Sequence, residues 1–305
     1  MKKIITLSLT ILIAITTSIN TFALTKENIS NSSDFYDKVI DETVQTVEFN
    51  EYDEFKKIQS MSEEELLASG WTSQEIEEIK TFDFEKELKK REIEKVLLGN
   101  SSRDISILSD ELERDWSEEE ISARAATINL VMGMSTVTNG GRDWTLYYEW
   151  HWTDRPVFAM TDIFGVRALG SVNGTVAIPV VLEKSSNTTY YYWHGGGIAE
   201  SKTVNYSRVD LNLAESKVEL QGMKDNLKTL ARSGYGYIYF NNTVGMDRLT
   251  VCLQYGHSQL TTNPSLSASV GTDGASAGVG IDFSYGVSTE KKLLKVYNPD
   301  TTEVN

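Results

Sequence analysis

Hydrophobic positions along the chain change their spacing near residue 126. Before that point they recur at helical intervals, which predicts helices over residues 33–124. One such series is Phe35, Val39, Ile40, Val44 and Val47. From Thr127 to Val296, apolar and polar residues alternate with a period of two, between stretches rich in Gly and Asn. The second pattern predicts an all-β antiparallel sandwich of about ten strands, preceded by a short acidic α-helical region.

Three predicted helix starts carry a capping box. In this motif a Ser or Thr and a Glu three residues later each accept a hydrogen bond from the other residue's backbone N–H. The three pairs are Ser62 with Glu65, Thr72 with Glu75, and Ser117 with Glu120. Two of these starts repeat one unit that also places a Trp before the cap and an Ile four residues after it. Packing of such a Trp on such an Ile is called a hydrophobic staple, and the two pairs are Trp71 with Ile76 and Trp116 with Ile121. Helices are therefore predicted to begin near residues 62, 72 and 117.

Turns in the second half are predicted from Gly, Asn and Ser clusters. They are "TNGGR" at 138–142, "VNG" at 172–174, "EKSSNT" at 183–188 and "HGGG" at 194–197. Pro179 indicates an edge or bulged strand, because proline cannot donate to a sheet. Near the C-terminus, Asp273-Gly274 suits a two-residue hairpin turn, which would pair Leu266 with Ile281 and Ala268 with Val279.

The first 23 residues, "MKKIITLSLTILIAITTSINTFA", have the lysines, short apolar run and small-residue cleavage pattern of a secretory signal peptide. The expected organisation is a signal peptide over 1–23, an acidic helical region over 24–124 with its twice-used Trp-capped helix start, and an antiparallel β-sandwich domain over 125–305. This organisation predicts a protein that is secreted and extracellular.

Acidic side chains are concentrated in the helical region. Residues 24–125 hold 28 Asp and Glu against 13 Lys and Arg, whereas residues 126–305 hold 16 against 14. This balance disfavours a nucleic-acid partner, because phosphate contacts need clustered Lys and Arg. Cys252 is the single cysteine, so it has no internal disulfide partner, and its apolar neighbours predict a buried thiol.

The stretch "YYEWHWT" at 147–153 is an expected strand with large aromatic side chains. Tyr148, Trp150 and Trp152 would point to one side, either into a core or outward as a platform for sugar rings. The other side would carry polar residues, with Asp154 close by. The candidate ligand-binding residues are Tyr147, Glu149, His151 and His194.

Known catalytic and metal-binding patterns do not emerge from the sequence. His151, His194 and His257 lie 43 and 63 residues apart without ligand spacing, so neither a metal nor another cofactor is predicted. "GASAG" at 274–278 matches the serine hydrolase pattern, but Ser276 falls inside an expected β-hairpin rather than at a strand-to-helix turn. These features favour a non-enzymatic protein.

The combination of "LLASGWTSQEIEEIK" with "YEWHWTDRPVFAMTDIFGV" resembles an uncharacterised group of secreted proteins of Gram-positive bacteria. The resemblance rests on Trp150, Trp152, Pro156 and Thr161-Asp162-Ile163, and it implies no activity.

The predicted function is that of a secreted non-enzymatic binding or interaction protein, with a glycan or cell-envelope surface as its partner. One alternative is a pore-forming or membrane-active β-protein that uses the 264–288 hairpin, the segment through which membrane interaction is expected. Its second arm reaches the length of about 9–11 residues that a spanning strand needs. A hydrolase of unknown substrate, using Glu149, His151 or His194, is the other alternative.

Overall fold

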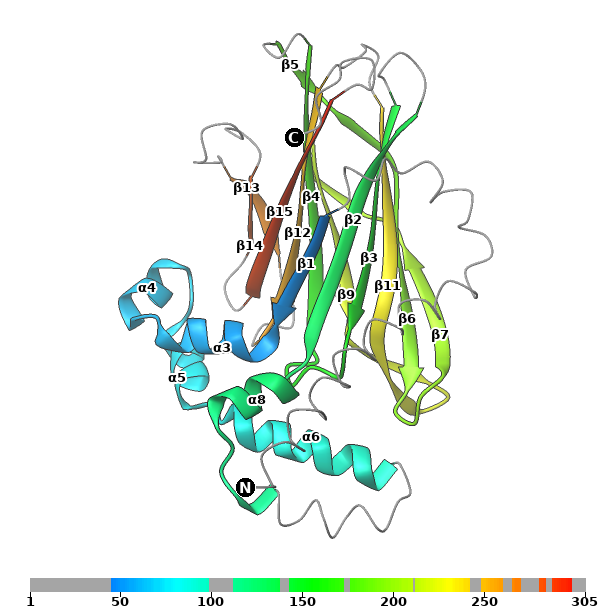
Figure 1. Ribbon diagram of the computed structural model, residues 1–305. Helices are drawn as coiled ribbons and strands as arrows, with labels where there is room; N and C mark the ends of the chain where they lie inside the picture. Colours follow the sequence, from blue (N-terminus) through cyan, green and yellow to red (C-terminus); the bar gives the residue numbers. More distant parts are fainter. Residues whose placement is uncertain are drawn as a thin grey trace, which may run out of the picture. The chain divides into compact units, whose positions relative to one another are not determined.

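The structure is a computed structural model that describes residues 45–98, 112–137, 143–172, 176–210, 212–241, 248–259, 265–269, 280–283 and 287–297. The expected signal peptide, the turn at 138–142 and the tip of the 264–288 hairpin lie outside these residues. Within the described part, the chain is an antiparallel β-sandwich with a short helical region on its N-terminal side (Figure 1).

Described helices are confined to the N-terminal part of the chain, as predicted. They are α3 (Glu51–Ser60), α4 (Glu63–Ala68), α5 (Ser73–Thr81), α6 (Phe84–Leu98) and α8 (Glu118–Arg124). All three predicted capping boxes are present, so the expected starts of α4, α5 and α8 are confirmed. Trp71 and Trp116, with Ile76 and Ile121, are buried in one apolar cluster of the helical region.

Two antiparallel sheets form the sandwich. The first sheet contains, in order, β1 (Gln45–Asn50), β2 (Thr127–Val137), β3 (Asp143–Trp152), β11 (Leu227–Asn241), β6 (Val181–Trp193) and β7 (Ile198–Val204), with β10 (Gln221–Lys224) paired to β11. The second contains β15 (Val287–Tyr297), β12 (Arg248–Ser258), β4 (Thr161–Val172), β9 (Leu213–Glu219) and β8 (Ser207–Asp210), with β5 (Val176–Pro179) paired to β4. A separate hairpin joins β13 (Leu266–Ser269) to β14 (Gly280–Phe283).

Bulky side chains from both sheets fill the space between them. Tyr148 of β3 stacks on Phe164 of β4 with their ring centroids 5.2 Å apart, and Trp152 contacts Tyr255 of β12 edge-on at 6.4 Å. These four rings are almost fully buried. Burial of each contributes on the order of 2–3 kcal/mol. This aromatic core explains how a domain without disulfides holds its two sheets together.

Two local predictions were wrong. Residues 45–50 were expected to be helical, but they form strand β1 and pair with β2. The helical spacing of apolar residues up to Val47 therefore does not produce a helix at these positions. The expected turn at 183–188 lies inside the long strand β6, where Asn187 and Thr188 are buried by neighbouring strands. In both places long-range pairing overrides a local preference.

The hairpin prediction was right about the faces and wrong about the register. Leu266 pairs with Phe283 and Ala268 with Ile281, two residues beyond the expected partners. A shift of two residues leaves each side chain on its original face, because the side-chain period of a strand is two. Ile281 is buried against Cys252 and other apolar side chains of the second sheet. Cys252 is itself buried, as predicted.

Candidate functional site

The two faces of β3 have opposite environments. Trp150 is 2% exposed and Trp152 is fully buried, so the interpretation of these tryptophans as an exposed sugar platform is wrong. They belong to the core between the sheets. Tyr147 and Glu149 are half-buried and His151 is exposed on the other face, as the alternation predicted.

Strand β11 beside β3 explains why an aromatic layer can also form on the outer face. Its segment "GYGYIY" at 234–239 alternates small and large residues, with Gly234 opposite Trp150 and Gly236 opposite Tyr148. A β-carbon added to Gly236 would lie 2.2 Å from the Tyr148 ring. The glycines therefore make room for the inner rings, while the tyrosines between them point outward.

These outward tyrosines join others from β3 and β6 into one surface, here called the tyrosine face. It consists of Tyr147, Tyr190, Tyr192, Tyr235, Tyr237 and Tyr239, all half-buried or exposed. The ring of Tyr235 lies 6.5 Å from that of Tyr147 and 6.1 Å from that of Tyr190. Burial and the neighbouring Tyr235 raise the pKa of Tyr190 above its ordinary value.

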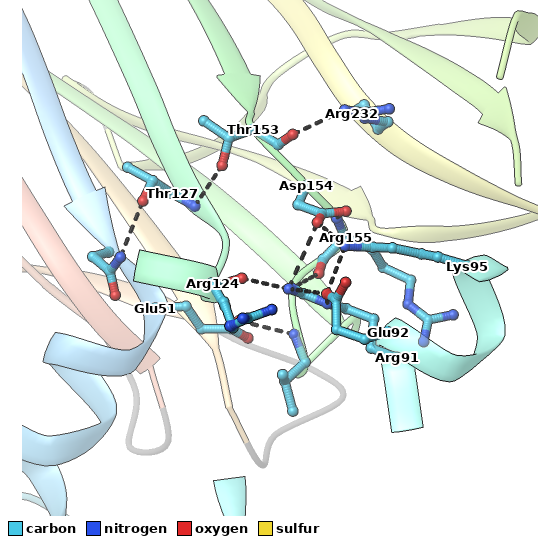
Figure 2. Close-up of polar contacts among 12 residues, drawn as sticks. Glu51, Arg91, Glu92, Lys95, Arg124, Thr127, Thr153, Asp154, Arg155 and Arg232 are labelled. Carbon is cyan, nitrogen blue, oxygen red and sulfur yellow. Dashed lines mark hydrogen bonds and ion pairs between the residues drawn. The ribbon is translucent and has the colours of Figure 1, made fainter. Parts of the chain in front are cut away.

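Polar side chains lie beside these rings. The Tyr147 hydroxyl donates a hydrogen bond to the Glu149 carboxylate. The pairing of β11 with β6 shifts register between Ala231 and Ser233, and the intervening Arg232 places its guanidinium 6.0 Å from the centre of the Tyr192 ring. Such a bulge re-aims a side chain without ending the strand. Arg232 also donates to the carbonyl of Thr153 across 2.9 Å (Figure 2).

His194, the fourth predicted site residue, lies apart from the other three. It follows β6 in the glycine-rich turn, whose predicted position is confirmed by positive φ angles at Gly196 and Gly197. No hydrogen bond among the described residues joins it to Tyr147, Glu149 or His151. Instead it lines two adjoining hollows, of about 60 and 520 Å³.

These hollows together form a region here called the charged groove. Its walls come from α6, the segment after β3, the turn after β6, and the β10–β11 hairpin; its main polar residues are Lys95, Asp154, Arg155, His194, Lys228 and Arg232. Asp154, expected beside Glu149 and His151, instead pairs with Lys95 and with the buried Arg91 (Figure 2). Partial burial and the neighbouring Arg155 lower the pKa of His194, and partial burial and Arg232 lower that of His151.

A second polar cluster, which sequence reasoning missed, ties the helical region to the sandwich. The carboxylate of Glu51, at the start of α3, accepts the backbone N–H groups of Val157 and Phe158 across 2.8 and 2.7 Å. It also lies 3.3 Å from Nε2 of His257, whose Nδ1 lies 2.8 Å from Asp162. All three titratable side chains are almost completely buried.

Burial disfavours a charge on His257, but the carboxylates of Asp162 and Glu51 outweigh it and raise the pKa of His257 to about 10. The imidazolium is therefore held between two acidic groups. The Tyr255 hydroxyl donates to the other oxygen of Asp162. Since these side chains are almost completely buried and contact one another, the cluster ties the start of α3 to β4 and β12.

In the part of the chain that the structure describes, His, Cys, Asp and Glu side chains do not gather in any group of three that could hold a metal ion. No helix among the described residues is long and apolar enough to cross a membrane.

No protein-family model and no curated protein matches the chain. Solved structures match it only distantly. A "Pore forming protein" is 11% identical, with 57% of this chain and 80% of that chain covered and a TM-score of 0.23. The "Clostridium perfringens delta-toxin" is 10% identical, covering 59% and 86%, with a TM-score of 0.20. The KRT10-binding region domain of the pneumococcal serine rich repeat protein PsrP is 10% identical, covering 52% and 88%, with a TM-score of 0.20. At these scores the chain is similar to each of them too weakly to support any inference.

Proposed function

We propose that this chain is a secreted, non-enzymatic binding protein whose tyrosine face recognises glycans of a cell surface or cell envelope. The observation that carries the proposal is the row of partly exposed rings across β3, β11 and β6. Flat aromatic surfaces pack well on the C–H faces of sugar rings, and tyrosine adds a hydroxyl that can donate to sugar oxygens.

The surroundings of the rings fit the same chemistry. Glu149 supplies acceptor oxygens next to Tyr147, and Arg232 supplies N–H donors beside Tyr192. Ligand sites commonly combine apolar surface with a few polar groups that fix orientation. The position of the tyrosines on three hydrogen-bonded strands keeps their spacing fixed, so little ordering is needed on binding.

A glycan array and isolated cell envelopes test the proposal directly. Tyr235→Ala removes the central ring of the face and should lower the affinity for bound glycans about tenfold or more. Tyr235→Phe keeps the ring and should retain most of the binding. Val209→Ala removes an exposed apolar side chain from β8 of the other sheet and should change nothing. Equal binding by Tyr235→Ala and the unaltered protein would contradict the proposal.

The second candidate function is membrane activity through the 264–288 hairpin. It is favoured by the position of β13 and β14, which belong to neither large sheet and contact the second sheet through the Ile281 cluster. A hairpin held in this way can detach from the sandwich without disrupting the strand pairing of either large sheet.

Dye release from liposomes separates the two candidates. Ile281→Cys places a second thiol in the cluster that contains Cys252, and oxidation would tether the hairpin once mass spectrometry confirms the bond. Leakage by the reduced variant that is lost on oxidation would support membrane activity. The absence of leakage from the unaltered protein would leave glycan binding as the better proposal.

A further inference from the structure

The charged groove lies next to the tyrosine face and has the opposite sign to the chain as a whole. The protein carries a formal net charge of −15, yet the residues lining the two hollows include five cationic side chains and only two acidic ones. The cationic ones are Arg91, Lys95, Arg155, Lys228 and Arg232.

These cations differ in their availability to a ligand. Arg91 is buried and donates to the carbonyls of Arg124 and Arg155, and Lys95 pairs with Glu92 and Asp154 (Figure 2). Both are therefore engaged in holding α6 against the segment after β3.

Arg155 pairs with the half-exposed Glu94 across 2.7 Å, a contact that solvent weakens. Lys228 and Arg232 have no acidic partner among the described residues. The Nε atom of Arg232 is enclosed and has no hydrogen-bond partner in the described part of the chain.

Arg232 connects the groove to the tyrosine face. It lines the smaller hollow while its guanidinium lies over the ring of Tyr192. The Tyr192 hydroxyl in turn lies 3.2 Å from the Ser233 hydroxyl on the outer side of β11. A sugar chain lying on the tyrosines would thus reach a positively charged end of the site beside Trp193 and His194.

We infer that the tyrosine face and the charged groove form one site for acidic glycans, with a sugar carboxylate received by Arg232 in the smaller hollow and Lys228 adding positive charge in the larger one; this rests on the proposed function. A carboxylate matches the planar fork of an arginine, which binds it through two parallel hydrogen bonds. The hollow beside Arg232, at about 60 Å³, suits a group of that size. Asp154 and Glu94 on the walls disfavour a more highly charged phosphate.

Matched pairs of ligands test the inference on the full protein. The pairs are sialyllactose against lactose, and trigalacturonic acid against its methyl ester, so that each pair differs in a carboxylate. The acidic member should bind about tenfold or more tightly at low salt. That preference should shrink as ionic strength rises. The pair with the larger preference identifies the source of the carboxylate as a sialic or a uronic acid.

Two variants locate the effect. The exposed Lys228→Gln should reduce the preference for the acidic member severalfold, while neutral sugars bind as before. Arg232→Gln should reduce this preference further and should also weaken the binding of neutral sugars, because Arg232 borders the Tyr192 ring. Lys86→Gln makes the same charge change near the start of α6 and should leave the preference for the acidic member unaltered. An unchanged thermal midpoint of Lys228→Gln shows that this variant folds normally. Equal affinity for both members of each pair, with binding to neutral sugars preserved, would overturn this inference and leave the proposed function standing. Failure of the unaltered protein to bind any glycan would overturn both.

Discussion

The buried pairing of His257 with Glu51 and Asp162 predicts a specific dependence of stability on pH. The pKa of His257 is about 10 in the folded chain, against an ordinary value of 6.5. A group whose pKa is raised on folding contributes its full stabilisation below the unfolded value and loses it as pH rises through the folded value. The free energy of unfolding should therefore decrease between about pH 6.5 and pH 10.

The size of this decrease follows from the shift. Each pKa unit corresponds to about 1.4 kcal/mol, so the shift represents on the order of 5 kcal/mol. This is a large part of the 5–15 kcal/mol that holds a typical domain together. Tyr255, which contacts Asp162, has a pKa raised well above its usual value by burial and by Asp162, so it does not titrate in this window.

Urea denaturation followed by tryptophan fluorescence, repeated at several pH values, measures the effect. Other groups titrate in the same range, so the decisive quantity is the difference between the unaltered protein and His257→Gln. That variant should be about 3–5 kcal/mol less stable at pH 7, because two carboxylates then stay buried without their cation. It should also lose most of the pH dependence. Parallel stability curves for the two proteins from pH 6.5 to pH 10 would refute the reasoning.

Other substitutions test the packing. Gly236→Ala should lower the free energy of unfolding by about 3 kcal/mol, because the added β-carbon meets the Tyr148 ring. Gly195→Ala, with no atom within 4 Å of the added β-carbon, should be almost neutral in the same thermal unfolding assay. Equal losses would contradict the packing of β11 on β3. Ser117→Ala should cost about 1 kcal/mol by removing the cap of α8, and an unchanged midpoint would show that the capping box is not formed in solution. Arg91→Met should cost about 3 kcal/mol in urea unfolding, since it leaves buried carbonyls without a donor; no loss would show that α6 is held by its apolar face alone.

Features decided by neighbouring residues could be predicted from the sequence. The capping boxes at Ser62, Thr72 and Ser117 depend on residues three positions apart, and all three form. The alternation of β3 correctly separated Trp150 from His151. It could not decide whether the tryptophans were inside or outside, because that depends on the second sheet.

Features decided by distant residues were missed. His257 lies 206 positions from Glu51 and 95 from Asp162, and no local pattern links them. The hairpin also brings Ile281 into a buried cluster with Cys252 of the second sheet, a contact that no local pattern reveals. The tyrosine face did leave a signal, since the Gly–Tyr alternation at 234–239 indicates a strand with small residues inside and rings outside.

Hydroxyl-radical footprinting with and without a bound glycan tests the central claim most directly. It reports on each tyrosine of the intact protein and depends on no substitution. The proposed site predicts that Tyr147, Tyr190 and Tyr235 become less reactive together, while exposed side chains on the second sheet, such as Val209, keep their reactivity. Protection confined to the second sheet or to the 264–288 hairpin, with those tyrosines unchanged, would contradict it.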